Sequence, residues 1–366
     1  MLVNQMDTHC EEMSGYYLKK LAKGDNQMDT HSEETSGYYL KKLAKGDNQM
    51  DTHSEETSRY YLKKLAKGDN KITLTNCYSE AIPDKLDLER FERGQQFFRR
   101  NISACLFTMM CSLVCGLCVT NLLEPLVFTG KSDTPRKSLI RYLKTMAHVV
   151  QWHCGNVWDI NSKARKSLQI VCGLHDRTRV DMMKKTEKLY VSQYDMSLVQ
   201  AGFMGAIIMY PKQFGIKASQ DDLKDYVYFW RWIGYLLGME DSNNICVNSL
   251  EEAIAICHEI ENDIVYPALH KPPPHFHHMA KAFTDGSNIF RNFKFFTPES
   301  VISFSLDLAK KERLPHSFVD KIRIIFLKVF VNLIYYSSLF RNFMNRNVED
   351  LCLALQDKRF DAGDGK

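Results

Sequence analysis

The sequence is most informative at residues 134–155, TPRKSLIRYLKTMAHVVQWHCG. A threonine followed by a proline is typical of a helix start, because the hydroxyl caps the first turn and proline suits its first position. Apolar residues then recur at the spacing of an amphipathic helix. This stretch therefore predicts one α-helix, and the same pattern fills most of the chain that follows.

One face of this predicted helix is polar. Its members are Arg141, Lys144, Thr145 and His148, which lie three, four and seven positions apart. Two cations, a hydroxyl and an imidazole on one narrow stripe are costly to bury without a partner. An anionic ligand or a cofactor would supply that partner, whereas a solvated face on a surface helix needs none. Both interpretations remain open at this point.

Helical spacing recurs beyond this stretch. It is found in 162–180, 195–210, 219–238, 249–265, 275–290, 297–311 and 316–345, and no segment alternates convincingly as a β-strand. We therefore predict an all-α domain from residue 71 to residue 366.

Composition narrows the function classes. The chain has 366 residues, and its formal net charge of +4 is too small to indicate a nucleic-acid-binding protein. Its eleven cysteines are dispersed and sit mostly in apolar runs, which favours reduced, buried thiols over a disulfide framework. The N-terminus shows no basic region followed by an apolar stretch, so we expect no secretory signal and an intracellular protein.

The first seventy residues differ from the rest. Residues 4–25, 26–47 and 48–69 are near-identical copies of one 22-residue unit. Each unit has room for one short helix, and isolated helices below about 12–15 residues are marginal in water. We predict that residues 1–70 are three tandem repeats, mostly disordered and not catalytic.

A long apolar run poses the question of a membrane span. No charged residue occurs between Arg100 and Glu124, and residues 102–120 approach the roughly 20 apolar residues that a bilayer requires. A buried helix in a large α-helical core gives the same pattern. The residues alone leave a buried helix and a membrane span equally open.

A single histidine, His175, stands on or beside the apolar face of 162–180. A histidine in that position is usually a satisfied core residue. The functional alternative is an axial ligand to haem iron, since such a site needs one neutral imidazole in an apolar pocket.

Five segments together resemble a known family, the endoplasmic-reticulum-bound oxygenase and rubber-oxygenase (latex-clearing protein) catalytic domain. They are Thr129–Lys131, Arg141–His148, Ser167–His175, Gln193–Gly205 and Phe229–Asn244, within a resemblance that runs from about Phe91 to about Leu355.

The resemblance implies an all-helical fold with a globin-like core that binds haem b. It implies that His175 is the proximal iron ligand, that Arg141 and Thr145 lie in the haem pocket, and that Lys144 approaches the distal side. His148, on the same stripe, is a further cofactor-binding candidate. Glu124 is near the family's pocket carboxylate, and as a buried base of raised pKa it would suit proton abstraction from an allylic carbon.

The same resemblance implies a haem-dependent oxygenase that uses dioxygen on a lipophilic, isoprenoid substrate, in association with the endoplasmic-reticulum membrane. Two positions depart from the family pattern: Cys172 replaces an arginine, and Val199 replaces a threonine. These departures keep two alternatives open, namely a catalytically inactive, membrane-associated helical binding protein that retains the fold, and a haem protein without turnover.

Overall fold

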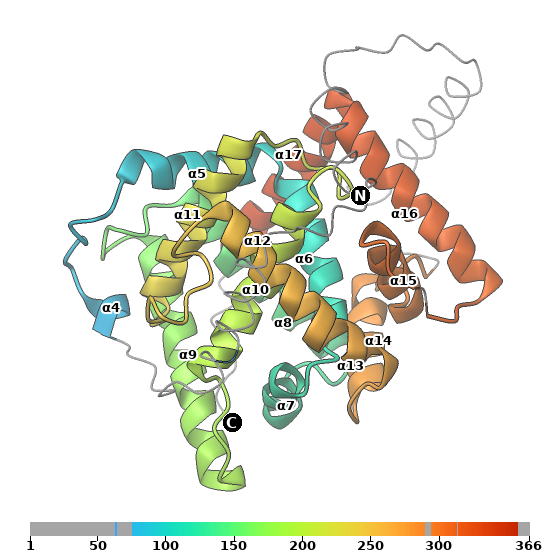
Figure 1. Cartoon of the computed structure of the whole chain (residues 1–366), viewed down its shortest axis with the longest axis horizontal. Helices are drawn as coiled ribbons and strands as arrows, with labels where there is room; N and C mark the ends of the chain where they lie inside the picture. The colour runs from blue at the N-terminus through green and yellow to red at the C-terminus, as the bar shows by residue number, and fades with distance from the viewer. Residues whose placement is uncertain (1–62, 64–74, 290–293, 313, 358–366) are drawn as a thin grey trace. The chain divides into compact units, whose positions relative to one another are not determined.

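The computed structural model describes Lys63 and residues 75–289, 294–312 and 314–357. The predicted repeats of residues 1–70 lie outside these described residues, apart from Lys63. Throughout the described residues the only regular structure is helical, so the prediction of an all-α fold is confirmed. Figure 1 shows the arrangement.

The helices follow one another with short connections. They are α4 (Thr75–Tyr78), α5 (Leu88–Arg100), α6 (Ile102–Gly116), α7 (Thr120–Thr129), α8 (Pro135–Cys154), α9 (Lys163–Thr186), α10 (Gln193–Met209), α11 (Gln220–Leu236), α12 (Leu250–Glu259), the π-helix η1 (Ile260–Val265), α13 (Tyr266–His270), α14 (Phe276–Ser287), α15 (Pro298–Leu308), α16 (Phe318–Tyr336) and α17 (Ser338–Asp357).

Local sequence fixes where many helices begin. Ser192, Ser219 and Ser317 each accept a hydrogen bond from the backbone three residues later, where an aspartate returns the contact. These capping boxes satisfy amide groups that have no partner within the helix. Thr134 caps α8 in the same way without the returning acid, as the threonine–proline pair predicts.

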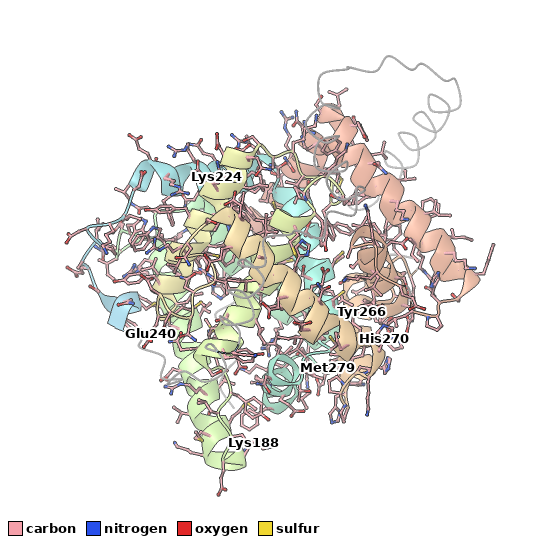
Figure 2. The ribbon with its side chains drawn as sticks, in the orientation of Figure 1. Lys188, Lys224, Glu240, Tyr266, His270 and Met279 are labelled. Atoms are coloured by element: carbon pink, nitrogen blue, oxygen red, sulfur yellow. The ribbon has the colours of Figure 1, made fainter. Side chains whose placement is uncertain are left out.

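The core is built around α6 and α11. Helix α6 is buried over most of its length and packs against α10, α15 and α17, while α11 packs against α5. Figure 2 shows side chains filling the space between these helices. Residues 102–116 therefore behave as a core helix, which is one of the two interpretations that the sequence left open.

Two predicted helices prove to be broken. The run 102–120 ends as a helix at Gly116, and α7 leaves at 94° to α6. The predicted helix 316–345 breaks at Ser337, where α16 meets α17 at 104°. Ser337 has extended backbone angles, and its hydroxyl caps the next helix by accepting from the Phe340 amide at 3.2 Å. Serine competes in this way with the helical hydrogen bonds of the backbone.

In the described part of the chain, no single helix has the length and apolar character to cross a bilayer. The bent pairs α6–α7 and α16–α17 meet that requirement only when the two helices of each pair are taken together.

Candidate functional site

The polar stripe of α8 lies against α9. His148 Nδ1 is 2.7 Å from Ser167 Oγ, which also accepts a hydrogen bond from the indole nitrogen of Trp152 at 3.0 Å. Because the two helices are joined by the short segment 155–162, this contact fixes an antiparallel register. Arg141 lies seven residues before His148 on α8, and His175 lies eight residues after Ser167 on α9. The antiparallel register therefore places Arg141 opposite His175.

Arg141 is a half-buried cation without a counter-ion. Its guanidinium donates to Thr129 Oγ1 at 2.9 Å, and no carboxylate of the described residues lies within ion-pair distance of it. Burial lowers the pKa of Arg141, which shows that its surroundings disfavour the charge that it carries. A guanidinium has five N–H donors, so an anion placed here would find several of them.

His175 presents an imidazole that is neutral at pH 7. Burial lowers its pKa to about 4, and the positive charge of Arg141 adds to this effect. The ring is half-buried and makes no hydrogen bond to another described residue. A neutral ring nitrogen with a free lone pair is what a transition metal requires of a histidine ligand.

The other three residues of the stripe are differently placed. The Thr145 hydroxyl donates to the Arg141 carbonyl of its own helix at 3.2 Å. Lys144 is exposed. Burial of His148 is the main cause of the lowered pKa of that histidine, and the positive charge of Lys144 is the second cause. His148 is half-buried, and its Nδ1 contacts Ser167, which leaves Nε2 as its available ring nitrogen.

Helix α7 is held to three neighbours. Its last residue, Thr129, bonds Arg141 of α8; the Phe128 ring lies 5.2 Å from the ammonium of Lys185 on α9; and Asn121 donates to Asp195 of α10 at 3.1 Å. The helix therefore crosses beside the ends of α8, α9 and α10.

Glu124 sits in the middle of α7 and is half-buried. Its charge, together with that of Asp195, raises the pKa of Tyr190, although burial of the tyrosine is the larger cause. Glu124 is thus near the α9–α10 connection, and the structure records no contact between it and His175 or Arg141.

Asp195 is a buried carboxylate that sequence reasoning did not single out. Burial raises its pKa in spite of bonds from Asn121 and from the backbone of its own capping box. The signal that could have found it is the acid at the third position of a helix, but that position usually indicates a cap alone.

Beyond Asp195, the same face of α10 carries the small residues Val199, Gly202 and Ala206. Gly202 is exposed although it lies within a helix, and a Cβ placed on it would meet no atom within 4 Å. This face of α10 therefore contacts α7 near the start of α10 and borders open space at Gly202.

A second histidine, His153, was missed by the sequence analysis. It is fully buried, with its ring 3.7 Å from the Phe98 ring and 4.3 Å from the Phe229 ring, centre to centre. Its Nδ1 contacts the Val149 carbonyl, while Nε2 has no partner among the described residues. Burial lowers its pKa to about 3. Its position on the apolar face of α8 was the available signal.

Cys172, which stands where the family has an arginine, is buried. Its sulfur lies 3.6 Å from the Leu236 carbonyl oxygen and interacts with the Cys77 thiol, and that interaction and burial raise its pKa. The side chain thus contacts α4 and α11. As a neutral thiol, it supplies no positive charge for an anion near Arg141.

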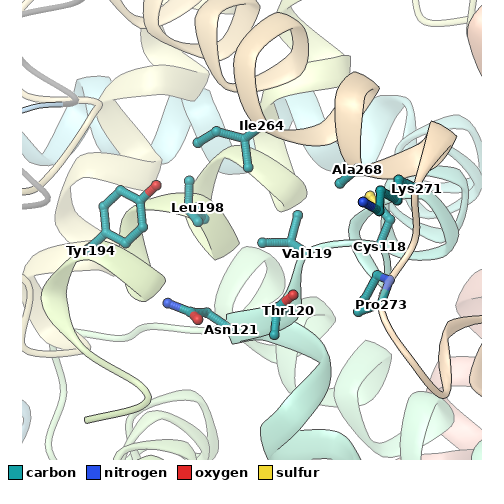
Figure 3. Close-up of a pocket in the computed structure, with 10 residues that line it drawn as sticks. All are labelled: Cys118, Val119, Thr120, Asn121, Tyr194, Leu198, Ile264, Ala268, Lys271 and Pro273. Atoms are coloured by element: carbon teal, nitrogen blue, oxygen red, sulfur yellow. The ribbon is translucent and has the colours of Figure 1, made fainter. Parts of the chain in front are cut away.

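A pocket of about 320 Å³ lies at the start of α7 (Figure 3). Its wall combines apolar groups with the polar ends of a few side chains: Cys118, Val119, Thr120, Asn121, Tyr194, Leu198, Ile264, Ala268, Lys271 and Pro273. Asn121 lies three residues before Glu124, so the pocket adjoins the α7 turn that carries this carboxylate.

Arg141 and His175 are of the residue types that a haem requires, and neither lines the pocket at the start of α7. Propionate groups need a cation such as Arg141, and iron needs a neutral imidazole such as His175, and the structure places both where α8 and α9 meet. Over the described residues, three or more His, Cys, Asp or Glu side chains nowhere gather in a cluster that could hold a bare metal ion. His270, in a histidine-rich stretch, packs edge-on against Tyr266 (Figure 2).

Comparison with known proteins found no matching family model, no matching curated protein and no matching solved structure. The family resemblance and the haem site stay predictions.

Proposed function

We propose that the chain is a haem b-dependent oxygenase with a globin-like helical core that oxidises a lipophilic, isoprenoid-type substrate with dioxygen. One observation carries the proposal: a half-buried guanidinium without a counter-ion faces an imidazole that burial keeps neutral. An anionic cofactor that also binds a nitrogen ligand would neutralise the unpaired guanidinium and use the free lone pair of the imidazole.

The residues have distinct tasks in this proposal. His175 offers its lone pair to iron, Arg141 pairs with a carboxylate of the cofactor, and Thr145, Lys144 and His148 border it along α8. Glu124 accepts a proton from the substrate near the α9–α10 connection. Haem, when bound, supplies the activation of dioxygen, while the protein provides orientation and a water-poor surround.

Apolar side chains of the neighbouring helices support the proposed substrate class. Half-buried apolar side chains of α7, α8 and α10, among them Leu122, Met146 and Phe203, pack at the edge of the core. The pocket at the start of α7 adds apolar side chains such as Val119, Leu198 and Ile264 to a lining that is polar in part. Such surfaces suit a hydrocarbon chain and dioxygen.

A non-catalytic, membrane-associated helical binding protein with the same fold is the second candidate. It is favoured by Cys172, which removes the expected arginine, and by the position of Glu124, for which no contact with His175 is recorded.

Haem binding is the first test. We expect the purified full-length protein to develop a Soret band on titration with haem, His175→Ala to lose it, and Arg141→Leu to weaken binding about tenfold, as loss of one ion pair would. His148→Ala is the matched control, because the proposal gives the iron to His175 and only a bordering place to His148, and it should retain most of the haem. Absence of the band in the wild type, or loss of it in His148→Ala with retention in His175→Ala, would contradict the assignment.

Oxygen uptake separates the two candidates. With a polyprenol as substrate, Glu124→Gln should lower the rate by about a hundredfold or more at unchanged haem content, because general bases contribute on that scale. Equal rates would eliminate Glu124 as the base. Haem binding without any uptake in the wild type would leave a haem protein that does not turn over.

A further inference from the structure

The outer face of α16 carries a row of apolar side chains along its length, with one exposed polar residue, Asn332, among them. The α16 stripe consists of side chains spaced three or four residues apart, so they share one face: Phe318, Ile322, Ile325, Val329, Leu333 and Tyr336. Phe318 is 73% exposed, Ile325 61% and Tyr336 70%. The helix has 19 residues, so the stripe is about 28 Å long.

The stripe is not the face that holds α16 to the protein. The opposite face buries Ile324, Leu327, Val331 and Ile334, and α16 packs against α15 and α17. Figure 1 shows α16 along one side of the described helices. Single exposed apolar residues are ordinary, but a continuous row of them marks a surface that meets something apolar.

Helix α17, beyond the bend at Ser337, also carries exposed apolar side chains. In α17, Leu339 is 72% exposed and Phe343 is exposed too. The bend of 104° places α17 across the end of α16, so α16 is not extended into a longer straight rod. By itself α16 fails the requirement for a membrane span, and the apolar surface instead lies along the side of a helix.

Lysine ammonium groups lie near both ends of the stripe. Asp320, the only acidic residue of α16, is buried and bonded to Thr297 and Arg323. Lys321 is exposed beside the stripe. At the other end, the ammonium groups of Lys212 and Lys217 lie 5.8 and 5.2 Å from the Tyr335 ring.

We propose that the α16 stripe lies in the interface of a membrane that contains anionic lipids, with the axis of α16 parallel to the bilayer plane. Long apolar faces bordered by cations are the pattern of interfacial helices, whose side chains enter the boundary between headgroups and acyl chains. Lys321, Lys212 and Lys217 then lie at the level of the lipid phosphates. This inference is independent of haem binding.

Vesicle flotation with the full-length protein tests the proposal. We expect binding to phosphatidylcholine vesicles that contain phosphatidylserine, weaker binding without phosphatidylserine, and weakening by salt, since the lysine contribution is screened. Ile325→Glu should lower the affinity about tenfold or more, because it removes a large apolar side chain from the interface and adds a charge. Ile82→Glu is the matched control, because Ile82 is 51% exposed in the segment before α5 and should leave binding unchanged.

A second measurement detects insertion of the stripe by a fluorescence change that appears on binding. Tyr336→Trp should show a blue-shifted fluorescence on vesicles and quenching by lipids brominated in the acyl chain. Tyr78→Trp, at a tyrosine that is 53% exposed on α4, should show neither.

Two results would overturn the proposal. One is equal vesicle binding of Ile325→Glu and Ile82→Glu with no fluorescence change in Tyr336→Trp. The other is a stable dimer of the wild type that Ile325→Glu dissociates while no vesicles bind, which would assign the stripe to a second copy of the chain.

Discussion

At the scale of single residues, the buried imidazoles are the most unusual groups of the molecule. His153 is enclosed by aromatic rings, and its Nε2 lacks a partner among the described residues. Burial holds its pKa near 3, so it stays neutral over the whole physiological range. In the unfolded chain the same ring has a pKa of about 6.5.

This difference predicts that acid destabilises the protein. Between pH 6.5 and about 3 the unfolded state binds one more proton at His153 than the folded state, so stability falls as pH falls through that window. At pH 5 the loss at this site is about 2 kcal/mol relative to pH 7. We expect His153→Phe to remove about that much of the pH dependence, measured by urea unfolding at both pH values.

The control for this prediction is Phe304→Leu, at a fully buried ring that packs against Phe107 and carries no titratable group. It should leave the acid loss near its wild-type size. His175, with a pKa of about 4, contributes a separate loss that neither change removes. An unaltered pH dependence in His153→Phe would contradict the assignment of this loss to His153.

At the scale of elements, the contact between α5 and α11 shows how a glycine sets the distance between two helices. A Cβ on Gly94 would lie 2.5 Å from the Asp225 carbonyl oxygen and 2.7 Å from Phe229 Cβ. Arg90 and Arg93 then reach the Asp225 carboxylate at 3.1 and 2.6 Å. The close approach of the backbones therefore lets side chains of α5 bond across to α11.

Gly94→Ala should destabilise the protein by about 1–3 kcal/mol, since the helices must separate or distort. Gly202→Ala makes the same chemical change within α10, where no atom lies within 4 Å of the added carbon. There the better helix propensity of alanine should stabilise by up to about 1 kcal/mol. Opposite signs in thermal or urea unfolding support this picture, and equal effects contradict it.

At the scale of the whole described fold, Arg165 joins segments that are far apart in sequence. Its guanidinium is buried and donates to the carbonyls of Cys77, Val157, Asn76 and Ser79 at 3.0, 3.1, 2.9 and 2.6 Å. All four acceptors are neutral, and burial lowers the pKa of Arg165. The residue holds α4 and the segment before α9 against the body of the fold.

Arg165→Met should cost about 2–4 kcal/mol in the free energy of unfolding, because four carbonyl groups, two of them in buried contacts, lose their donor. Hydrogen exchange of the amides in 76–79 should become faster than in the wild type. Lys166→Met, at the exposed neighbouring position, should change neither measurement. Unchanged exchange in Arg165→Met would show that α4 is held by other contacts.

The amino-acid sequence by itself determined the class of fold and most helix limits, because helical spacing and capping act over only a few residues. It placed α8 over 134–155, where the structure has Pro135–Cys154, and it identified the stripe from Arg141 to His148. Only the tertiary structure decided that Arg141 faces His175, that Glu124 lies near Tyr190, that α16 ends at Ser337 and that its stripe remains uncovered. These features depend on which helices pack together, and the free energy of that packing is shared among residues too distant in sequence for a local pattern to reveal.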